Sequence, residues 1–143
     1  MPYRYLEDIA TADVALEAWG DTLEELFIAA ADATMNVMVS DLNTIHDQVR
    51  RTISVESHAL DLLLFRFLQE FVFYKDAEQL LLRAQRVVIR QDGERHTAEA
   101  QVYGERLDPS KHELVVDVKA VTLHRFQVER TARGWQAQVI LDI

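Results

Sequence analysis

The feature that most constrains the fold is a helical segment, about His58 to Tyr74, that is apolar on nearly every side. Apolar residues at helical spacing form one face, and further apolar residues lie on the other sides: Leu60, Leu63, Leu64, Phe67, Leu68 and Phe71, then Leu62, Phe65, Val72 and Phe73. A helix of this kind is typical of a buried position. We therefore expect a central helix, capped by Ser57 and packed against a sheet and a neighbouring helix. The segment also carries polar residues, namely Asp61, Arg66, Gln69 and Glu70, so it is not expected to span a membrane.

A second helix is predicted from about Thr22 to Val39. Its apolar side recurs at helical spacing: Leu23, Leu26, Phe27, Ala30, Thr34, Val37 and Met38. Asp21 or Thr22 is suited to cap the N-terminus, and Glu24 or Glu25 would complete a capping box three residues later.

The rest of the pattern is typical of β-strands. Strands are predicted for Tyr3–Leu6, for the alternating residues 12–19, for 49–55, for 81–90 and 97–103 on either side of Asp92-Gly93, for 114–119, and for 121–130 and 135–143 around Gly134. No βαβ repeat is apparent. The predicted fold is a single α+β domain over residues 1–143, with two layers: a mixed sheet of about six or seven strands and two helices packed on it.

The amino-acid composition excludes several classes of site and makes others unexpected. The chain has no cysteine, which excludes disulfides, thiolate zinc sites and cysteine nucleophiles. This and the lack of a signal-peptide pattern at the N-terminus lead us to expect a cytoplasmic protein with no membrane association. The net charge is −9, with 24 acidic and 15 basic side chains, so direct binding to nucleic acid is not expected. The acidic surplus suits cations or a basic protein surface, although solubility alone explains it equally well.

Catalytic motifs are scarce. The sequence has no Gly-rich phosphate loop, no Gly-x-Ser-x-Gly elbow and no His-Glu-x-x-His pair. The histidines are scattered, with none at close ligand spacing: His46, His58, His96, His112 and His124.

Two acids stand out against the β-strand pattern. Asp13 interrupts an apolar strand near the N-terminus, and Asp142 lies between Leu141 and Ile143 at the end of the last strand. If these strands are neighbours, the two carboxylates converge on the face opposite the apolar residues, and the terminal carboxylate of Ile143 adds further oxygens. Such an all-oxygen site suits Ca²⁺, with Mg²⁺ or Mn²⁺ as alternatives. Spacing alone favours the other interpretation, two separate acids solvated by water.

A second charged pair, Asp117 and Lys119, lies two residues apart on one predicted strand. The pair is interpreted either as a cross-strand ion pair on the surface or as a charged pair presented to a partner or a phosphate. The residues alone favour the surface pair.

Taken jointly, several stretches of the chain resemble the archease family. They are residues 11–15, 18–27, Gly104-Glu105, Asp108-Pro109, His112-Glu113-Leu114, residues 118–122 with His124, and residues 135–143. No single motif is highly specific, but together the stretches cover nearly the whole chain in the family's order.

The resemblance implies an accessory protein rather than an enzyme. Archeases assist the RNA-splicing ligase of the RtcB type, which seals tRNA halves, by promoting guanylylation of its active-site histidine and multiple turnover. By this resemblance Asp13 and Asp142, with Ile143, carry the metal, which the family links to calcium. Lys119 takes the place of the family's functional lysine, and Asp117, His112 and His124 are expected on the side of the partner.

Two other functions stay open. One is a chaperone or stability partner of an RNA-modifying enzyme such as a tRNA methyltransferase, which needs a hydrophobic docking patch instead of the acids. The other is a small metal-dependent hydrolase using Asp13, Asp142 and one histidine, against which the missing nucleophile and base motifs count. The chain also departs from the family pattern, which has Asp-His before Thr-Ala-Asp, because Ile9 and Ala10 occupy these positions. This puts one ligand or partner contact in doubt.

Overall fold

The computed structural model describes residues 1–7 and 13–143. In chain order, the elements are β1 (Tyr3–Leu6), β2 (Val14–Gly20), α1 (Leu23–Met38), the short 3₁₀ helix η1 (Leu42–Thr44), β3 (Val49–Ser57), α2 (Leu60–Glu78), β4 (Leu80–Asp92), β5 (Arg95–Arg106), β6 (Ala120–Thr131) and β7 (Gly134–Asp142). No helix in these described ranges is long and apolar enough to cross a membrane.

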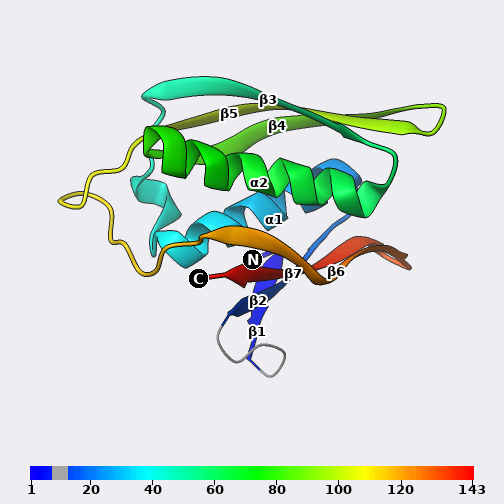
Figure 1. The fold of residues 1–143 in the computed structure, drawn as a ribbon, viewed down its shortest axis with the longest axis horizontal. Helices are drawn as coiled ribbons and strands as arrows, with labels where there is room; N and C mark the ends of the chain where they lie inside the picture. The colour runs from blue at the N-terminus through cyan, green and yellow to red at the C-terminus, as the bar shows by residue number, and fades with distance from the viewer. Residues whose placement is uncertain (8–12) are drawn as a thin grey trace.

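The strands form two separate sheets that enclose the helices (Figure 1). One sheet has the order β1-β2-β7-β6 and the other the order β3-β5-β4, and all strand pairs are antiparallel. Both α1 and α2 contact strands of both sheets. The α+β class, the two helices and the seven strands are thus confirmed. The expected two-layer arrangement with one mixed sheet is corrected to three layers, because α2 is apolar on more than one side and packs against strands of both sheets.

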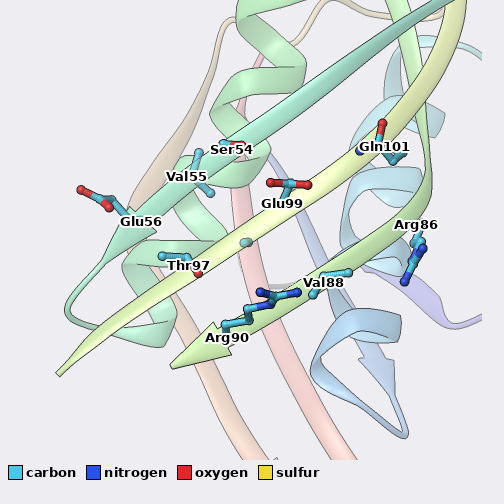
Figure 2. A pocket seen from close by; sticks show the side chains of 10 residues that line it. Ser54, Val55, Glu56, Arg86, Val88, Arg90, Thr97, Glu99 and Gln101 are labelled. Carbon is cyan, nitrogen blue, oxygen red and sulfur yellow. The ribbon is translucent and has the colours of Figure 1, made fainter. Parts of the chain in front are cut away.

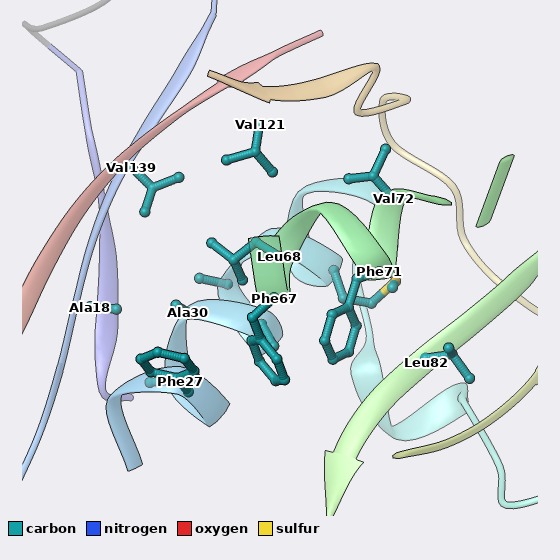
Figure 3. Close-up of a cluster of buried hydrophobic side chains, with 14 of the residues drawn as sticks. Ala18, Phe27, Ala30, Phe67, Leu68, Phe71, Val72, Leu82, Val121 and Val139 are labelled. Carbon is teal, nitrogen blue, oxygen red and sulfur yellow. The ribbon is translucent and has the colours of Figure 1, made fainter. Parts of the chain in front are cut away.

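The central position of α2 is confirmed by its aromatic residues. Phe67 is fully buried, with its ring centroid 5.3 Å from that of Phe27 on α1 and 5.2 Å from that of Phe71. Figure 3 shows these rings between side chains of the two sheets, with Leu82 on one side and Val121 and Val139 on the other. One continuous hydrophobic core therefore joins all three layers.

Helix capping follows the sequence in α1 and departs from it in α2. The Thr22 hydroxyl accepts a hydrogen bond from the Glu25 N–H at 3.1 Å, and the Glu25 carboxylate accepts one from the Asp21 N–H at 2.9 Å. The expected Ser57 cap of α2 is wrong, because Ser57 is the last residue of β3 and the N-cap is Ala59, which provides no side-chain hydrogen bond.

The strand expected at residues 114–119 is also wrong. This segment forms a single bridge, between Leu114 and Val39, and it is not part of either sheet. Alternating apolar residues form a strand only where a partner strand is within reach. Here the neighbouring backbone is the end of α1 and the residues after it, which offers two hydrogen bonds, from Val115 N–H to the Met38 carbonyl oxygen and from Ser40 N–H to the Glu113 carbonyl oxygen. The predicted strand start at Ala12 lies outside the described residues.

Candidate functional site

The strands at whose ends Asp13 and Asp142 lie are neighbours, which is the condition for their two carboxylates to converge. β2 and β7 are neighbours in the four-stranded sheet, and Val14 lies opposite Leu141. Asp13 is one residue before this pair and Asp142 one residue after it, so the two acids occupy adjacent ends of neighbouring strands. We refer to Asp13, Asp142 and the adjoining Ile143 as the acidic tip.

The acidic tip is accessible and its carboxylates are unengaged within the described chain. Val139 and Leu141 point into the core, so alternation places the Asp142 side chain on the outer face of the sheet. Asp13 is exposed, and Asp142 and Ile143 are half-buried. Neither carboxylate forms an ion pair or hydrogen bond with another described side chain.

The oxygen atoms of the acidic tip are suitable ligands for a hard cation, but they are too few to complete its coordination. Two carboxylates and the main-chain oxygen of Ile143 are oxygen ligands of the kind that Ca²⁺ and Mg²⁺ prefer. Among the described residues, no three histidine, aspartate or glutamate side chains gather in a way that could hold a metal. A cation bound here would therefore take its remaining ligands from water or from a partner.

Lys119 lies beside the acidic tip. Its backbone N–H donates to the Asp142 carbonyl oxygen at 2.8 Å, and the next residue, Ala120, pairs with Asp142 across β6 and β7. The Lys119 side chain is exposed. The structure thus brings together three of the residues predicted from the sequence, Asp13, Asp142 and Lys119, at one end of one sheet.

Asp117 pairs with a different lysine from the one expected. The buried Lys75 Nζ at the C-terminal end of α2 donates to the Asp117 carboxylate at 2.5 Å and to the Val118 carbonyl oxygen at 2.8 Å, and it also bonds Asp76 at 2.6 Å. Burial alone would lower the pKa of Lys75, but the hydrogen bonds to Asp117 and Asp76 outweigh burial and raise it. Asp117 therefore ties residues 113–119 to α2, and the expected pairing with Lys119 is wrong.

His112 is buried and belongs to a polar cluster inside the fold. Its side chain is 1% exposed, its Nδ1 accepts a hydrogen bond from the Asp108 N–H at 2.9 Å, and its Nε2 donates to Glu105 at 2.7 Å. Lys111 Nζ also donates to Glu105, at 2.8 Å, and lies 3.0 Å from His46 Nδ1. The expectation that His112 contacts a partner directly is thus contradicted by its burial, and its role is to fix the chain after β5.

This cluster predicts a pH dependence of stability. Burial opposes ionisation of Glu105, but hydrogen bonds from Lys111 and His112 lower its pKa to about 2 from the ordinary 4.5. Because the folded-state pKa is depressed, this stabilisation is present above pH 4.5 and is lost as the pH falls towards 2. We expect a loss of about 1–2 kcal/mol after allowance for screening. Urea unfolding at several pH values measures this loss. The free energy of unfolding should depend less on pH below 4.5 in Glu105→Gln than in the wild-type protein. The same pH dependence in both proteins would contradict the assignment to Glu105.

His124 lies where a partner can reach it. Thr122 pairs with Ile140 and Gln127 with Gln138, so residues 123–126 of β6 bulge out opposite Val139 alone. His124 is exposed in this bulge, and its neighbour Arg125 has a φ of 52°. The bulge begins just beyond the part of β6 that pairs with the end of β7, so His124 stays a candidate partner contact close to the acidic tip.

The structure also contains a polar hollow that was not predicted from the sequence. It has a volume of about 700 Å³ and lies on the outer face of the three-stranded sheet, where its lining includes Arg86 and Arg90 of β4 and Glu99 and Gln101 of β5 (Figure 2). None of the predicted site residues lines it. Outward-facing polar residues on a solvated sheet carry no signal that separates such a hollow from an ordinary surface.

Comparisons with known proteins identify the family and the fold of the chain. The model of the archease protein family (MTH1598/TM1083) matches residues 3–143. The chain is 39% identical to a protein archease of Pyrococcus abyssi, with 93% of this chain and 94% of that protein covered. It is 40% identical to a protein archease of Pyrococcus furiosus, with the same coverage.

Solved structures share the fold. The solution structure of Methanobacterium thermoautotrophicum protein 1598 superposes with a TM-score of 0.86 at 29% identity, covering 99% of each chain. The crystal structure of a Thermotoga maritima protein described as an archease and possible chaperone superposes with a TM-score of 0.55 at 16% identity, covering 94% of this chain and 93% of that one, which shows likeness of fold alone. On the family match and the identities over nearly the full length, this chain belongs to the archease family.

Proposed function

We propose that this protein is a metal-binding accessory factor that activates an RNA-splicing ligase, promoting guanylylation of the ligase and its multiple turnover. The observation that carries the proposal is the convergence of Asp13, Asp142 and Lys119 at one end of the four-stranded sheet. Membership of the archease family supports it. Proteins of this family are generally accessory rather than catalytic.

The guanylylation step explains what such a tip can contribute. The ligase histidine attacks the α-phosphate of GTP, so that a nitrogen–phosphorus bond forms and the bond to the leaving pyrophosphate breaks. A divalent cation, Ca²⁺ or else Mg²⁺ or Mn²⁺, supplies charge neutralisation for the phosphates in this kind of reaction. Asp13 and Asp142 would hold such a cation through their carboxylate oxygens, and the exposed Lys119 would contact a phosphate or an acidic side chain of the ligase.

The charge of the chain fits a protein partner better than RNA. With a net charge of −9 and two carboxylates at the tip, the surface repels a phosphate backbone. The ligase is therefore the component that holds the RNA, and this protein docks on the ligase.

A second function is favoured by one observation. Leu114, Val115 and Val116 are consecutive and exposed, which gives the chain an apolar surface of the kind that a chaperone of a tRNA methyltransferase would need. That function would depend on these apolar residues and would not depend on Asp13 and Asp142.

Multiple-turnover RNA ligation by the ligase of the same organism tests the proposal. With GTP, divalent cation and excess cleaved RNA, we expect the ligase alone to stop after about one turnover and the ligase with this protein to continue. Equal product yields with and without the protein would contradict the proposed function and leave the chaperone function as the alternative.

A further inference from the structure

We propose that the extended residues Leu114–Val116, together with the hollow beside them, dock an extended apolar segment of the ligase that is flanked by lysine or arginine. We call these three residues the apolar segment. The inference rests on the proposed function, since it names a second contact surface for the same partner.

The first observation is exposure. Leu114, Val115 and Val116 are 44%, 58% and 39% exposed, and they are consecutive. They line a hollow of about 160 Å³ together with Met38, Leu81 and Leu107. This is room for about five water molecules at ~30 Å³ each, or for one large aliphatic side chain. Scattered exposed apolar residues need no explanation, but three in a row beside an apolar hollow mark an interaction surface.

The second observation is the state of the backbone. The segment is held along one side only, where Ser40 N–H donates to the Glu113 carbonyl oxygen at 3.0 Å and Val115 N–H donates to the Met38 carbonyl oxygen at 2.9 Å. In an extended chain the next peptide groups point the opposite way. Within the part of the chain that the structure describes, the N–H groups of Leu114 and Val116 make no hydrogen bond. This is the open edge to which a strand from another protein adds.

The third observation is rigidity. Lys75 fixes the C-terminal end of the segment through Asp117 and the Val118 carbonyl oxygen, and Asp142 fixes Lys119 through its own carbonyl oxygen. Together with the hydrogen bonds of Glu113 and Val115 to the backbone at Ser40 and Met38, these contacts hold the segment at both ends, so binding orders little chain on this side. Figure 1 shows this yellow-to-orange connection passing the end of α2 towards the C-terminus, so it leads directly to the acidic tip.

The charged residues around the apolar segment indicate which kind of partner segment binds there. Glu113 precedes it, and the exposed carboxylates of Asp76 and Asp117 lie at its other end, whereas Lys75 is buried and shared between those two aspartates. Two exposed lysines lie nearby, Lys111, which pairs with Glu105, and Lys119, two residues beyond Asp117. The three exposed acids therefore outnumber the exposed lysines around an apolar centre. A segment with an apolar side chain for the hollow and basic residues on both flanks is complementary to this surface.

Charge variants at Val115 test the inference, because Val115 is the most exposed residue of the segment and its backbone hydrogen bond survives substitution. We would measure the affinity for the ligase directly and the protein concentration that gives half-maximal ligation. We expect Val115→Glu to weaken binding about tenfold and Val115→Lys to weaken it more, because the lysine also repels the basic flanks of the partner. The maximal rate at saturation should not change in either variant.

The matched control is Leu62→Glu, which puts the same charge on an exposed apolar residue in the first turn of α2, and it should bind as the wild-type protein does. Wild-type affinity in Val115→Lys, or stronger weakening by Glu than by Lys, would overturn the inference. So would a dimer of the free protein that Val115→Lys dissociates, because the segment would then pair with a second copy. Binding to the ligase that depends on Val115 but brings no stimulation would instead refute the proposed function and leave the docking surface standing.

Discussion

Replacing Asp142 with alanine is expected to abolish stimulation of the ligase while leaving the fold intact. Asp142 lies next to Asp13 across the β2–β7 pair, and its loss removes one of the two carboxylates of the acidic tip. Since disturbing even the outer partners of a metal ligand costs 10–100-fold in affinity, we expect cation affinity to fall by about 100-fold or more. Isothermal titration with Ca²⁺ and multiple-turnover ligation measure the two effects separately.

Asp92→Ala provides the matched control for this variant. It also removes one exposed carboxylate, but from the hairpin between β4 and β5. We expect it to bind Ca²⁺ and to stimulate the ligase as the wild-type protein does. The free energy of unfolding should change by no more than about 0.5 kcal/mol in either variant, because both positions are outside the core. Normal stimulation by Asp142→Ala would show that the acidic tip does not carry the function.

The largest effect on stability is expected for Phe67→Ala. Phe67 has no exposed surface and packs against Phe27 and Phe71 between the two sheets. Its truncation removes apolar contacts and leaves a cavity that neither sheet can close, so the free energy of unfolding should fall by about 4 kcal/mol. That is a large share of the 5–15 kcal/mol typical of a domain. Urea denaturation monitored by circular dichroism provides the measurement.

Phe73→Ala is the control for the aromatic residues of α2. Phe73 is on the same helix but is 54% exposed, so its loss should cost less than about 1 kcal/mol. Similar costs for the two variants would contradict the central position of α2 between the sheets.

The elements with local signals were predictable from the sequence. Thr22 with Glu25, the apolar faces of the two helices and the Asp92-Gly93 turn are each encoded within a few residues, and each is confirmed. The division of the strands into two sheets was not predictable, because it depends on which distant strands pair. The apolar residues on several sides of α2 could have predicted contact with a second sheet, although Leu62 and Phe73 show that one side of the helix stays exposed.

The candidate site also depends on contacts between distant residues, which local sequence signals do not predict. Asp13 and Asp142 could be placed together only on the condition that β2 and β7 are neighbours, which spacing does not reveal. Lys75 was missed, because a lysine in the last turn of a helix is normally explained by the helix dipole and solvent. His112 was expected at a partner surface, but its burial depends on Glu105, a residue that pattern reasoning leaves unassigned. The departure at Ile9 and Ala10 lies outside the described residues, so its effect on the acidic tip stays a prediction.

Guanylylation of the ligase with labelled GTP, followed over time after mixing, tests the central claim most directly. The ligase would be compared alone, with the wild-type protein and with Asp142→Ala, at one fixed cation concentration. We predict that the wild-type protein speeds formation of the guanylylated ligase and that Asp142→Ala leaves the rate of the ligase alone. Equal rates in all three reactions, or equal stimulation by both forms of the protein, would contradict the claim that the acidic tip activates the ligase.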